Sequence, residues 1–152
     1  MSLIILKKKY LYIYIMAPFQ KDSYDFGVKR ELEVLPFIEQ ILGNKVIHDK
    51  DTFNDFDFYT DEYNIELKSR TINSDCFETT FTTPQKRNKA NNSKKKVLWL
   101  FGFTDGIYYL LFDDHKEMIN NLKINVYNTR YGERENINIP IKLLKPFSKN
   151  TF

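Results

Sequence analysis

The stretch DFDFYTDEYNIELKSR, residues 55–70, decides the fold that we expect for this chain. Apolar and polar side chains alternate in residues 55–59 and again in residues 63–68, which is the pattern of half-buried β-strands. Residues 60–62 are polar and few enough to form a tight turn between the two runs. The stretch therefore predicts a β-hairpin.

The register of this hairpin brings acidic side chains together. If residues 61–62 form a two-residue loop, Asp57 lies directly opposite Glu66, and Asp55 lies opposite Lys68. Directly opposed residues in a hairpin have Cβ atoms about 5 Å apart. Two carboxylates at that distance repel each other unless a cation lies between them. The acidic pair thus needs either free access of solvent or a chemical purpose.

The two faces of the hairpin carry different side chains. Phe56 and Phe58 are expected to share one face of the first strand, whereas Glu66 and Lys68 share the polar face of the second strand. On an arbitrary strand, Glu66 and Lys68 would be an ordinary solvent-facing pair. The rest of the chain decides between that interpretation and a functional site.

A helix is predicted upstream of the hairpin, over residues 23–44. Gly43 supplies its C-terminal stop, and Pro36 is expected to kink the helix or divide it in two. Glu31 lies within the apolar stripe of this helix, and a carboxylate on a core-facing side suggests a function, with a salt-bridged helix residue as the alternative. The stripe consists of Val28, Leu32, Leu35, Ile38 and Leu42.

The rest of the chain supplies the other elements of an α/β domain. Residues 84–93 are expected to form a short helix with Pro84 in its first turn, and residues 97–103 are a nearly continuous apolar run, as in a buried central strand. His48, near the acidic region, is assigned a structural role. The remaining predicted elements are a strand at 45–48, a turn and strand within 104–112, a helix within 113–122, and a hairpin of strands at 123–127 and 136–144.

The composition indicates one domain over residues 1–152, with a lead-in at 1–20 and a C-terminal hairpin extension at 123–145. Cys76 is the only cysteine, so the chain has no disulfide framework, and we expect an intracellular protein in the reducing cytoplasm or nucleus. The apolar run near the N-terminus is too short to cross a membrane, so no membrane partner is expected. Translation could start at the first residue or at Met16.

The combination of these features resembles a known family. Asp57 followed by Glu66-Leu67-Lys68, after a helix that carries an inward Glu31, is similar to the active-site motif of the PD-(D/E)XK nuclease superfamily. Asp55 leaves the identity of the first acid open, and the hairpin register favours Asp57. The resemblance covers roughly residues 25–112. It implies a restriction-endonuclease-like αβββαβ core, an α/β fold in which helices flank a mixed β-sheet.

The resemblance also implies a reaction and a role for each motif residue. Asp57, Glu66, the backbone carbonyl of Leu67, and Glu31 would hold Mg²⁺ (or Mn²⁺), because a hard cation prefers oxygen ligands. Lys68 would hold the attacking water or offset charge on the scissile phosphate. The implied reaction is metal-dependent hydrolysis of phosphodiester bonds.

Basic residues supply a candidate nucleic-acid-binding surface. The net charge is only +3, but residues 86–96 hold six basic side chains and no acid. Clusters of Lys and Arg attract backbone phosphates, although a solvated loop would have the same composition. The candidate binding residues are Arg70, Gln85, Lys86, Arg87, Lys89, Lys94, Lys95 and Lys96.

The expected function is a metal-dependent nuclease that cleaves DNA as an endonuclease. The C-terminal hairpin is a candidate contact in a homodimer. The sequence leaves DNA or RNA, and endo- or exonucleolytic cleavage, open. The alternatives are a catalytically silent nucleic-acid-binding or assembly module with the same fold, and an unrelated α/β domain with a chance motif. The chain has no P-loop, dinucleotide fingerprint or serine-nucleophile motif, and too few Cys and His residues for a structural zinc site.

Overall fold

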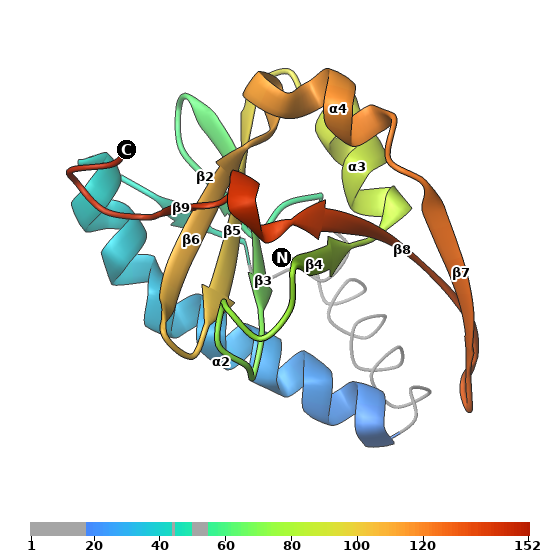
Figure 1. Cartoon of the computed structure of the whole chain (residues 1–152). Helices are drawn as coiled ribbons and strands as arrows, with labels where there is room; N and C mark the ends of the chain where they lie inside the picture. The colour runs from blue at the N-terminus through green and yellow to red at the C-terminus, as the bar shows by residue number, and fades with distance from the viewer. Residues whose placement is uncertain (1–17, 44, 50–54) are drawn as a thin grey trace, which may run out of the picture.

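Two β-sheets and their flanking helices make up the described part of the chain, residues 18–43, 45–49 and 55–152 of a computed structural model (Figure 1). Most of the predicted lead-in, with Met16, lies outside the described residues. The elements are α2 (Pro18–Leu42), β1 (Ile47–His48), β2 (Phe58–Tyr59), β3 (Tyr63–Ser69), β4 (Thr79–Thr82), α3 (Pro84–Asn91), β5 (Lys96–Phe103), β6 (Gly106–Leu111), a 3₁₀ turn (Phe112–His115), α4 (Lys116–Asn120), β7 (Ile124–Thr129), β8 (Gly132–Pro140), a second 3₁₀ turn (Ile141–Leu143) and β9 (Lys145–Pro146).

The larger sheet is mixed, with strand order β1-β2-β3-β5-β6-β9. Strands β3 and β5 pair in parallel, and the other neighbours pair antiparallel. All residues of β5 after Lys96 are buried, because this strand has a neighbour on each side and packed residues on both faces. The prediction of a central buried strand at 97–103 is thus confirmed.

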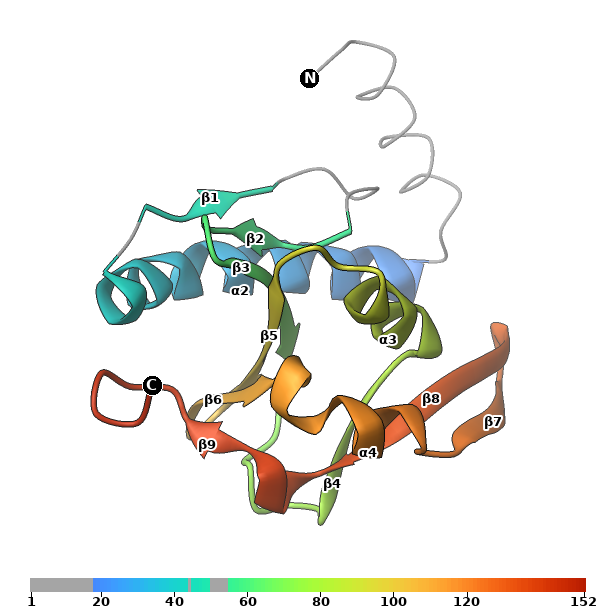
Figure 2. The same cartoon turned by 90° about the horizontal axis from the view of Figure 1, so that it is seen from above.

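Each face of the larger sheet has its own hydrophobic core. Leu98 and Leu100 of β5 pack with α2 on one face, whereas Trp99 and Phe101 belong to the core shared with α3, α4 and β8 on the other. Figure 2 shows α3 and α4 beside β5, with the β7–β8 hairpin next to them. The prediction of an α/β fold with a mixed sheet and flanking helices is confirmed at this level.

Helix α2 is one continuous element with Pro36 inside it, so of the two predicted effects of Pro36, a kink or a division of the helix, the division is wrong. Pro36 cannot donate to the Leu32 carbonyl, but both residues are exposed, and water can replace the missing partner. Of the predicted stripe, Ile38 is buried and Leu35 and Leu42 pack against the same core, but Leu32 is 49% exposed, and Val34, which was not included, lies in the core. Gly43 ends the helix at φ 66°, as predicted. No helix in the described ranges is long and apolar enough to cross a membrane.

The β2–β3 hairpin has the predicted register. Phe58 pairs with Ile65, and Tyr59 pairs with Asn64. The Thr60 hydroxyl accepts from the backbone N–H of Tyr63 at 2.9 Å and so closes the short loop. The ordered ladder begins only at Phe58, and the chain before it is irregular. For that reason the face predicted for Phe56 is wrong: it packs in the core opposite to that of Phe58.

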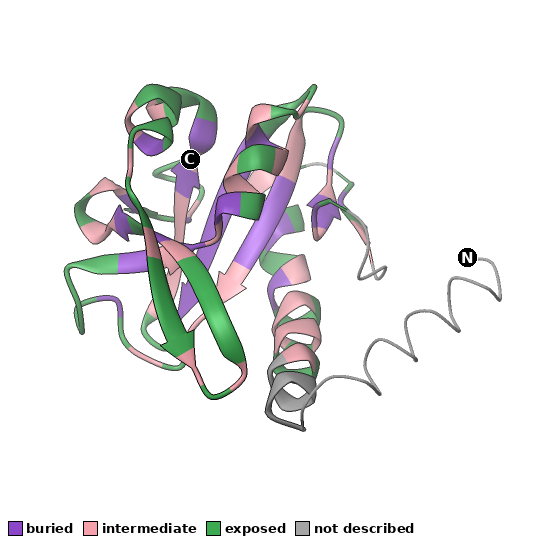
Figure 3. Cartoon of the chain, turned by 90° about the vertical axis from the view of Figure 1, so that its right-hand side faces the viewer, coloured by how far each residue is buried: buried purple, intermediate pink, exposed green. Residues whose placement is uncertain are grey.

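The second half of the chain contains most of the predicted elements and two strands that were missed, β4 and β9, and a 3₁₀ turn stands at Ile141–Leu143 where a strand was predicted. Helix α3 begins at Pro84, as predicted, and the Thr83 side chain caps it by accepting from the backbone N–H of Lys86. Strands β7 and β8 form the predicted hairpin, which is exposed along most of its length (Figure 3). Strand β4 was not predicted; it pairs with β8 and completes a three-stranded sheet.

Candidate functional site

The hairpin fixes Asp57 against the strand that carries Glu66 and Lys68. The Asp57 Oδ2 atom accepts a hydrogen bond from the backbone N–H of Leu67, at 2.9 Å, and the Asp57 N–H donates to the Ile65 carbonyl at 3.0 Å. The second bond shows that β2 is distorted just before its ladder begins. As a result, the Asp57 side chain turns toward the segment between the two motif residues of β3.

Glu66 lies on the face of β3 that is turned toward α3. It is 9% exposed, and its carboxylate forms an ion pair with Lys86 of α3. Its second oxygen, Oε2, is buried and has no hydrogen-bond partner within the described part of the chain. Burial and the Asp57 carboxylate raise the pKa of Glu66 from 4.5 to about 7, while Lys86 acts in the opposite direction.

Glu31 reaches the same region from α2. Burial, the charge and hydrogen bonding of Asp57, and the charge of Glu66 raise the pKa of Glu31 from 4.5 to about 8. Three carboxyl groups from three segments of the chain therefore influence one another, and the protonated form of Glu31 is favoured. The expectation that this helix turns Glu31 inward agrees with its side chain being 17% exposed.

His48 also lies near the site, although the sequence analysis gave it only a structural role. Its Nε2 atom lies 2.7 Å from Oε2 of Glu31, and its ring packs 5.1 Å from that of Phe58. The side chain is only 5% exposed. His48 thus holds Glu31 in place from β1. In the sequence, only its position at the end of a predicted strand beside the acidic region indicated that it lies near the site.

Two lysines on different elements supply positive charge. Burial, and then the charges of Arg70 and Lys86, lower the pKa of Lys68, and its Nζ lies 5.4 Å from the ring centre of Phe81. Burial by itself would lower the pKa of Lys86, but Glu66 and the two other carboxyl groups raise it above its ordinary value. Lys86 is therefore held as a cation beside the acids.

Asp55 does not join this cluster. Its side chain is 71% exposed and lies 4.0 Å from Nζ of Lys89. The ladder does not reach Asp55, so the prediction that it lies opposite Lys68 is wrong. The ladder does not reach Asp57 either, so the predicted direct pairing of Asp57 with Glu66 is not present. Asp57 instead contacts the motif strand through the backbone N–H of Leu67.

Most basic residues of the segment 86–96 make contacts within the chain. Arg87 donates to the carbonyls of Ile119 and Leu122, at 3.2 and 3.1 Å, and so fastens the end of α4 to α3. The other contacts are Lys95 Nζ to the Thr60 carbonyl at 2.7 Å and Lys96 Nζ to Glu62 at 3.5 Å. Gln85 and Lys94 are exposed, without a hydrogen bond or ion pair to other described residues.

Arg70 is likewise engaged by its own chain. Its guanidinium donates to Thr80 Oγ1 at 3.3 Å and to the Phe81 carbonyl at 2.9 Å, and it lies 3.6 Å from the centre of the Phe81 ring. Burial lowers its pKa to about 10, so the group stays charged at neutral pH. Arg70 joins the end of β3 to β4, a role that the sequence could not indicate because β4 was not predicted.

The acidic cluster has the chemistry of a site for a hard cation, but its side chains do not converge. No three His, Cys, Asp or Glu side chains form a metal-binding group in the ranges that the structure describes. The buried, unpartnered Oε2 of Glu66 and the raised pKa values of Glu31 and Glu66 nevertheless fit a missing positive charge. Carboxylate oxygens are also the ligands that Mg²⁺ prefers.

Comparisons with known proteins add no relative. No model of a known protein family matches the chain, and no curated protein matches it at a significant level. The function is therefore inferred from the residues and their arrangement.

Proposed function

We propose that this chain is a metal-dependent nuclease of the PD-(D/E)XK type that hydrolyses phosphodiester bonds in DNA as an endonuclease. The observation that carries the proposal is the mutual influence of Glu31, Asp57 and Glu66 near the hairpin, where burial and the Asp57 charge raise the pKa values of Glu31 and Glu66. Perturbed pKa values of grouped acids are frequent at catalytic sites. Lys68 follows Glu66 on the same strand, as the motif requires.

The arrangement of elements also supports this assignment. Helix α2 precedes three strands, and β3 then pairs in parallel with β5 after the crossover through α3. This order resembles the αβββαβ core, into which β4 is inserted before α3. We assign the chain to the restriction-endonuclease-like folds on this basis.

Each residue then has a role that follows from its position. Asp57, Glu66, the Leu67 carbonyl and Glu31 would hold Mg²⁺ or Mn²⁺, which supplies charge neutralisation at the phosphate and polarises a bound water. Lys68, whose pKa is lowered, would hold the attacking water or the phosphate oxygen. His48 would orient Glu31 through the 2.7 Å contact. Lys86 would leave Glu66 when the metal binds and contact the phosphate backbone.

Exposed basic residues and the exposed β7–β8 hairpin indicate two partners, DNA and a second copy of the chain. Lys94 and Gln85 are exposed, and Lys96 is exposed beside Glu62, so all three could contact a phosphate backbone, in line with a DNA partner. A homodimer through the β7–β8 hairpin stays a prediction, supported by Val126, which is 57% exposed, and Tyr127, which is 40% exposed.

One observation favours the second candidate, a catalytically silent nucleic-acid-binding module. Lys86 already neutralises Glu66 from within the chain. In a silent module this ion pair would be a permanent structural contact, and the site would not need a metal. The two functions differ in what happens when Mg²⁺ is added.

Cleavage assays separate these functions. Labelled linear, circular, single-stranded and four-way-junction DNA, together with RNA, is incubated with Mg²⁺ or Mn²⁺ and with EDTA. We expect metal-dependent cutting of DNA that is lost in Glu66→Ala and Lys68→Ala. Glu62→Ala is the matched control, since Glu62 is exposed in the loop of the same hairpin. Binding without cutting under either metal would support the silent module instead.

A further inference from the structure

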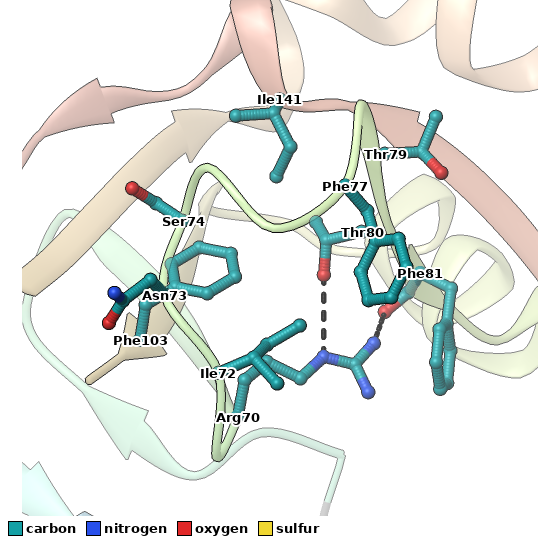
Figure 4. A pocket seen from close by; sticks show the side chains of 10 residues that line it. All are labelled: Arg70, Ile72, Asn73, Ser74, Phe77, Thr79, Thr80, Phe81, Phe103 and Ile141. Atoms are coloured by element: carbon teal, nitrogen blue, oxygen red, sulfur yellow. Dashed lines mark hydrogen bonds between the residues drawn. The ribbon is translucent and has the colours of Figure 1, made fainter. Parts of the chain in front are cut away.

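A cavity of about 280 Å³ opens beside the candidate site, between β4, the loop that precedes it and the end of β5 (Figure 4). Its walls are mainly apolar, with Phe77, Phe81 and Phe103 as the aromatic side chains and Ile72 and Ile141 as the aliphatic ones. Small ligand sites in proteins have this character, an apolar lining with a few polar groups.

The loop that forms one wall of the cavity is held in place by hydrogen bonds. The Ser74 N–H and hydroxyl donate to the carboxylate of Asp105, at 2.8 and 2.6 Å. The backbone N–H of Thr104 donates to the Ile72 carbonyl at 3.0 Å. The cavity is therefore preformed, and a ligand would not have to order this wall.

Phe81 connects the cavity to the candidate catalytic residues. Its ring lines the cavity and also lies 5.4 Å from the Nζ of Lys68. The Arg70 guanidinium carbon lies 3.6 Å from the centre of the same ring, and the group is fixed by hydrogen bonds to Thr80 and to the Phe81 carbonyl. Lys68 therefore lies beside one of the residues that line the cavity, Phe81, and the positively charged Arg70 is another of them.

Phe77 forms the outer wall and is 67% exposed. It also lines a second, more open cavity of about 700 Å³, which contains Asp75 and Glu78. A polyanionic strand would avoid these two acids. Its phosphates would instead lie toward Lys68 and Arg70, so that a base attached to them would point at the first cavity.

We propose that the cavity lined by Phe77, Phe81 and Phe103 receives one unpaired nucleobase of the nucleic acid that the chain cleaves. This inference rests on the proposed nuclease function and specifies its substrate as nucleic acid with an unpaired nucleotide near the cleavage position. Aromatic rings and the Arg70 guanidinium offer flat faces on which a base stacks. Asn73 and Ser74 supply the polar part of the lining.

The chemistry of the cavity selects a base over other parts of the substrate. A phosphate would be placed among phenyl rings without enough donors, and a base pair is too large for about 280 Å³. A base inside a duplex would have to leave its stack, which costs free energy unless the base is already unpaired. Single strands, bulges and mismatches are therefore the favoured substrates.

The test compares binding of paired and unpaired nucleic acid to the full chain. The probes are a single strand, its fully paired duplex, and the duplex with one bulged fluorescent adenine analogue, and Glu66→Ala prevents cutting. We expect the bulged duplex to bind about 5- to 100-fold more tightly than the paired one, with quenching of the fluorescent base. Phe77→Ala should remove most of this preference. Phe37→Ala, which truncates a phenylalanine 54% exposed on α2, should keep it.

Two results overturn the inference, and they are distinguishable. If Phe77→Ala leaves the preference and the quenching unchanged while DNA binding persists, the cavity does not hold the base, and the nuclease proposal is unaffected. If the natural chain neither binds nor cuts any of these polymers, the proposed function fails and the base-binding site fails with it.

Discussion

Lys86 of α3 forms an ion pair with Glu66 of β3, the central acid of the candidate motif. The ammonium group supplies the countercharge that a metal ion would supply in an active nuclease. A buried carboxylate between like charges needs such a cation, because its ionisation is otherwise costly. Lys86 and a divalent metal should therefore compete for Glu66.

Replacement of Lys86 by Met tests this competition. Without metal, Lys86→Met should lower the free energy of unfolding by about 1–3 kcal/mol, because Glu66 loses its partner. With Mg²⁺, the variant should gain more thermal stability than the natural chain, because no lysine has to be displaced. Thermal denaturation across a Mg²⁺ titration, with EDTA as the reference, measures both effects.

The matched control for this prediction is Lys89→Met. Lys89 is on the same helix and is 33% exposed, against 34% for Lys86, but its partner Asp55 lies on the surface. Its replacement should change neither the metal-free stability nor the response to Mg²⁺ by more than about 0.5 kcal/mol. An identical Mg²⁺ response in both variants would argue against a metal at Glu66.

Glu31→Gln should separate stability from activity. The change removes a carboxyl group whose ionisation is disfavoured by burial and by Asp57, so the metal-free variant should be more stable than the natural chain above about pH 8. Metal-dependent cleavage should fall by about 100-fold or more, because a ligand is lost. Urea denaturation and initial cleavage rates measure the two effects. Glu39→Gln, on the exposed side of the same helix, should change neither.

The same pKa values predict how metal-free stability depends on pH. Glu31 and Glu66 have pKa values of about 8 and about 7 in the folded protein, against 4.5 ordinarily. The folded state therefore binds more protons than the unfolded state between about pH 4.5 and about pH 8. The stabilising contribution of the protonated Glu31 and Glu66 is present below about pH 4.5 and is lost as the pH rises through about 8. The free energy of unfolding should therefore fall with rising pH.

The size of this pH effect can be checked by urea denaturation in EDTA. A fall of about 2–4 kcal/mol between about pH 5 and about pH 9 is expected from the two shifts, after allowance for relaxation of the site. Glu31→Gln should flatten the curve. Stability that rises with pH over the same range would contradict the raised pKa values and the crowding of Glu31, Asp57 and Glu66.

Local patterns predicted the centre of the fold. The two-residue periodicity and the short loop determine the hairpin register, so the pairing of Phe58 with Ile65 followed from the sequence alone. The long apolar run of β5 and the proline at the start of α3 are also local signals. The register places Asp57 near the motif strand, but its hydrogen bond with Leu67 depends on the irregular segment before β2, which no local pattern indicated.

Contacts between distant segments were not predictable in the same way. Strand β4 is short and mostly threonine, and it becomes a strand because β8, far along the chain, pairs with it. The contact of His48 with Glu31 joins residues 17 positions apart across two elements. On α2 the prediction failed at one position, because Leu32 looked like core although Val34 fills that place.

Arg87 and Lys94 both belong to the basic segment 86–96, but their side chains have different surroundings in the folded chain. Arg87 holds the carbonyls of Ile119 and Leu122, whereas Lys94 is exposed. Arg87→Ala should lower the free energy of unfolding by about 1–2 kcal/mol, because two carbonyls lose a charged donor. Its effect on DNA affinity should be small once the variant is folded.

Lys94→Ala should show the reverse pattern, with unchanged stability and weaker DNA binding. If Lys94 contacts a phosphate, the slope of log affinity against log salt should decrease by about 1, with a similar loss for all DNA sequences. Fluorescence anisotropy at several salt concentrations, beside urea denaturation of both variants, measures these quantities. Weaker binding with an unchanged slope would mean that Lys94 acts on the fold of the loop and not on a phosphate, because only a direct charge contact releases a counterion.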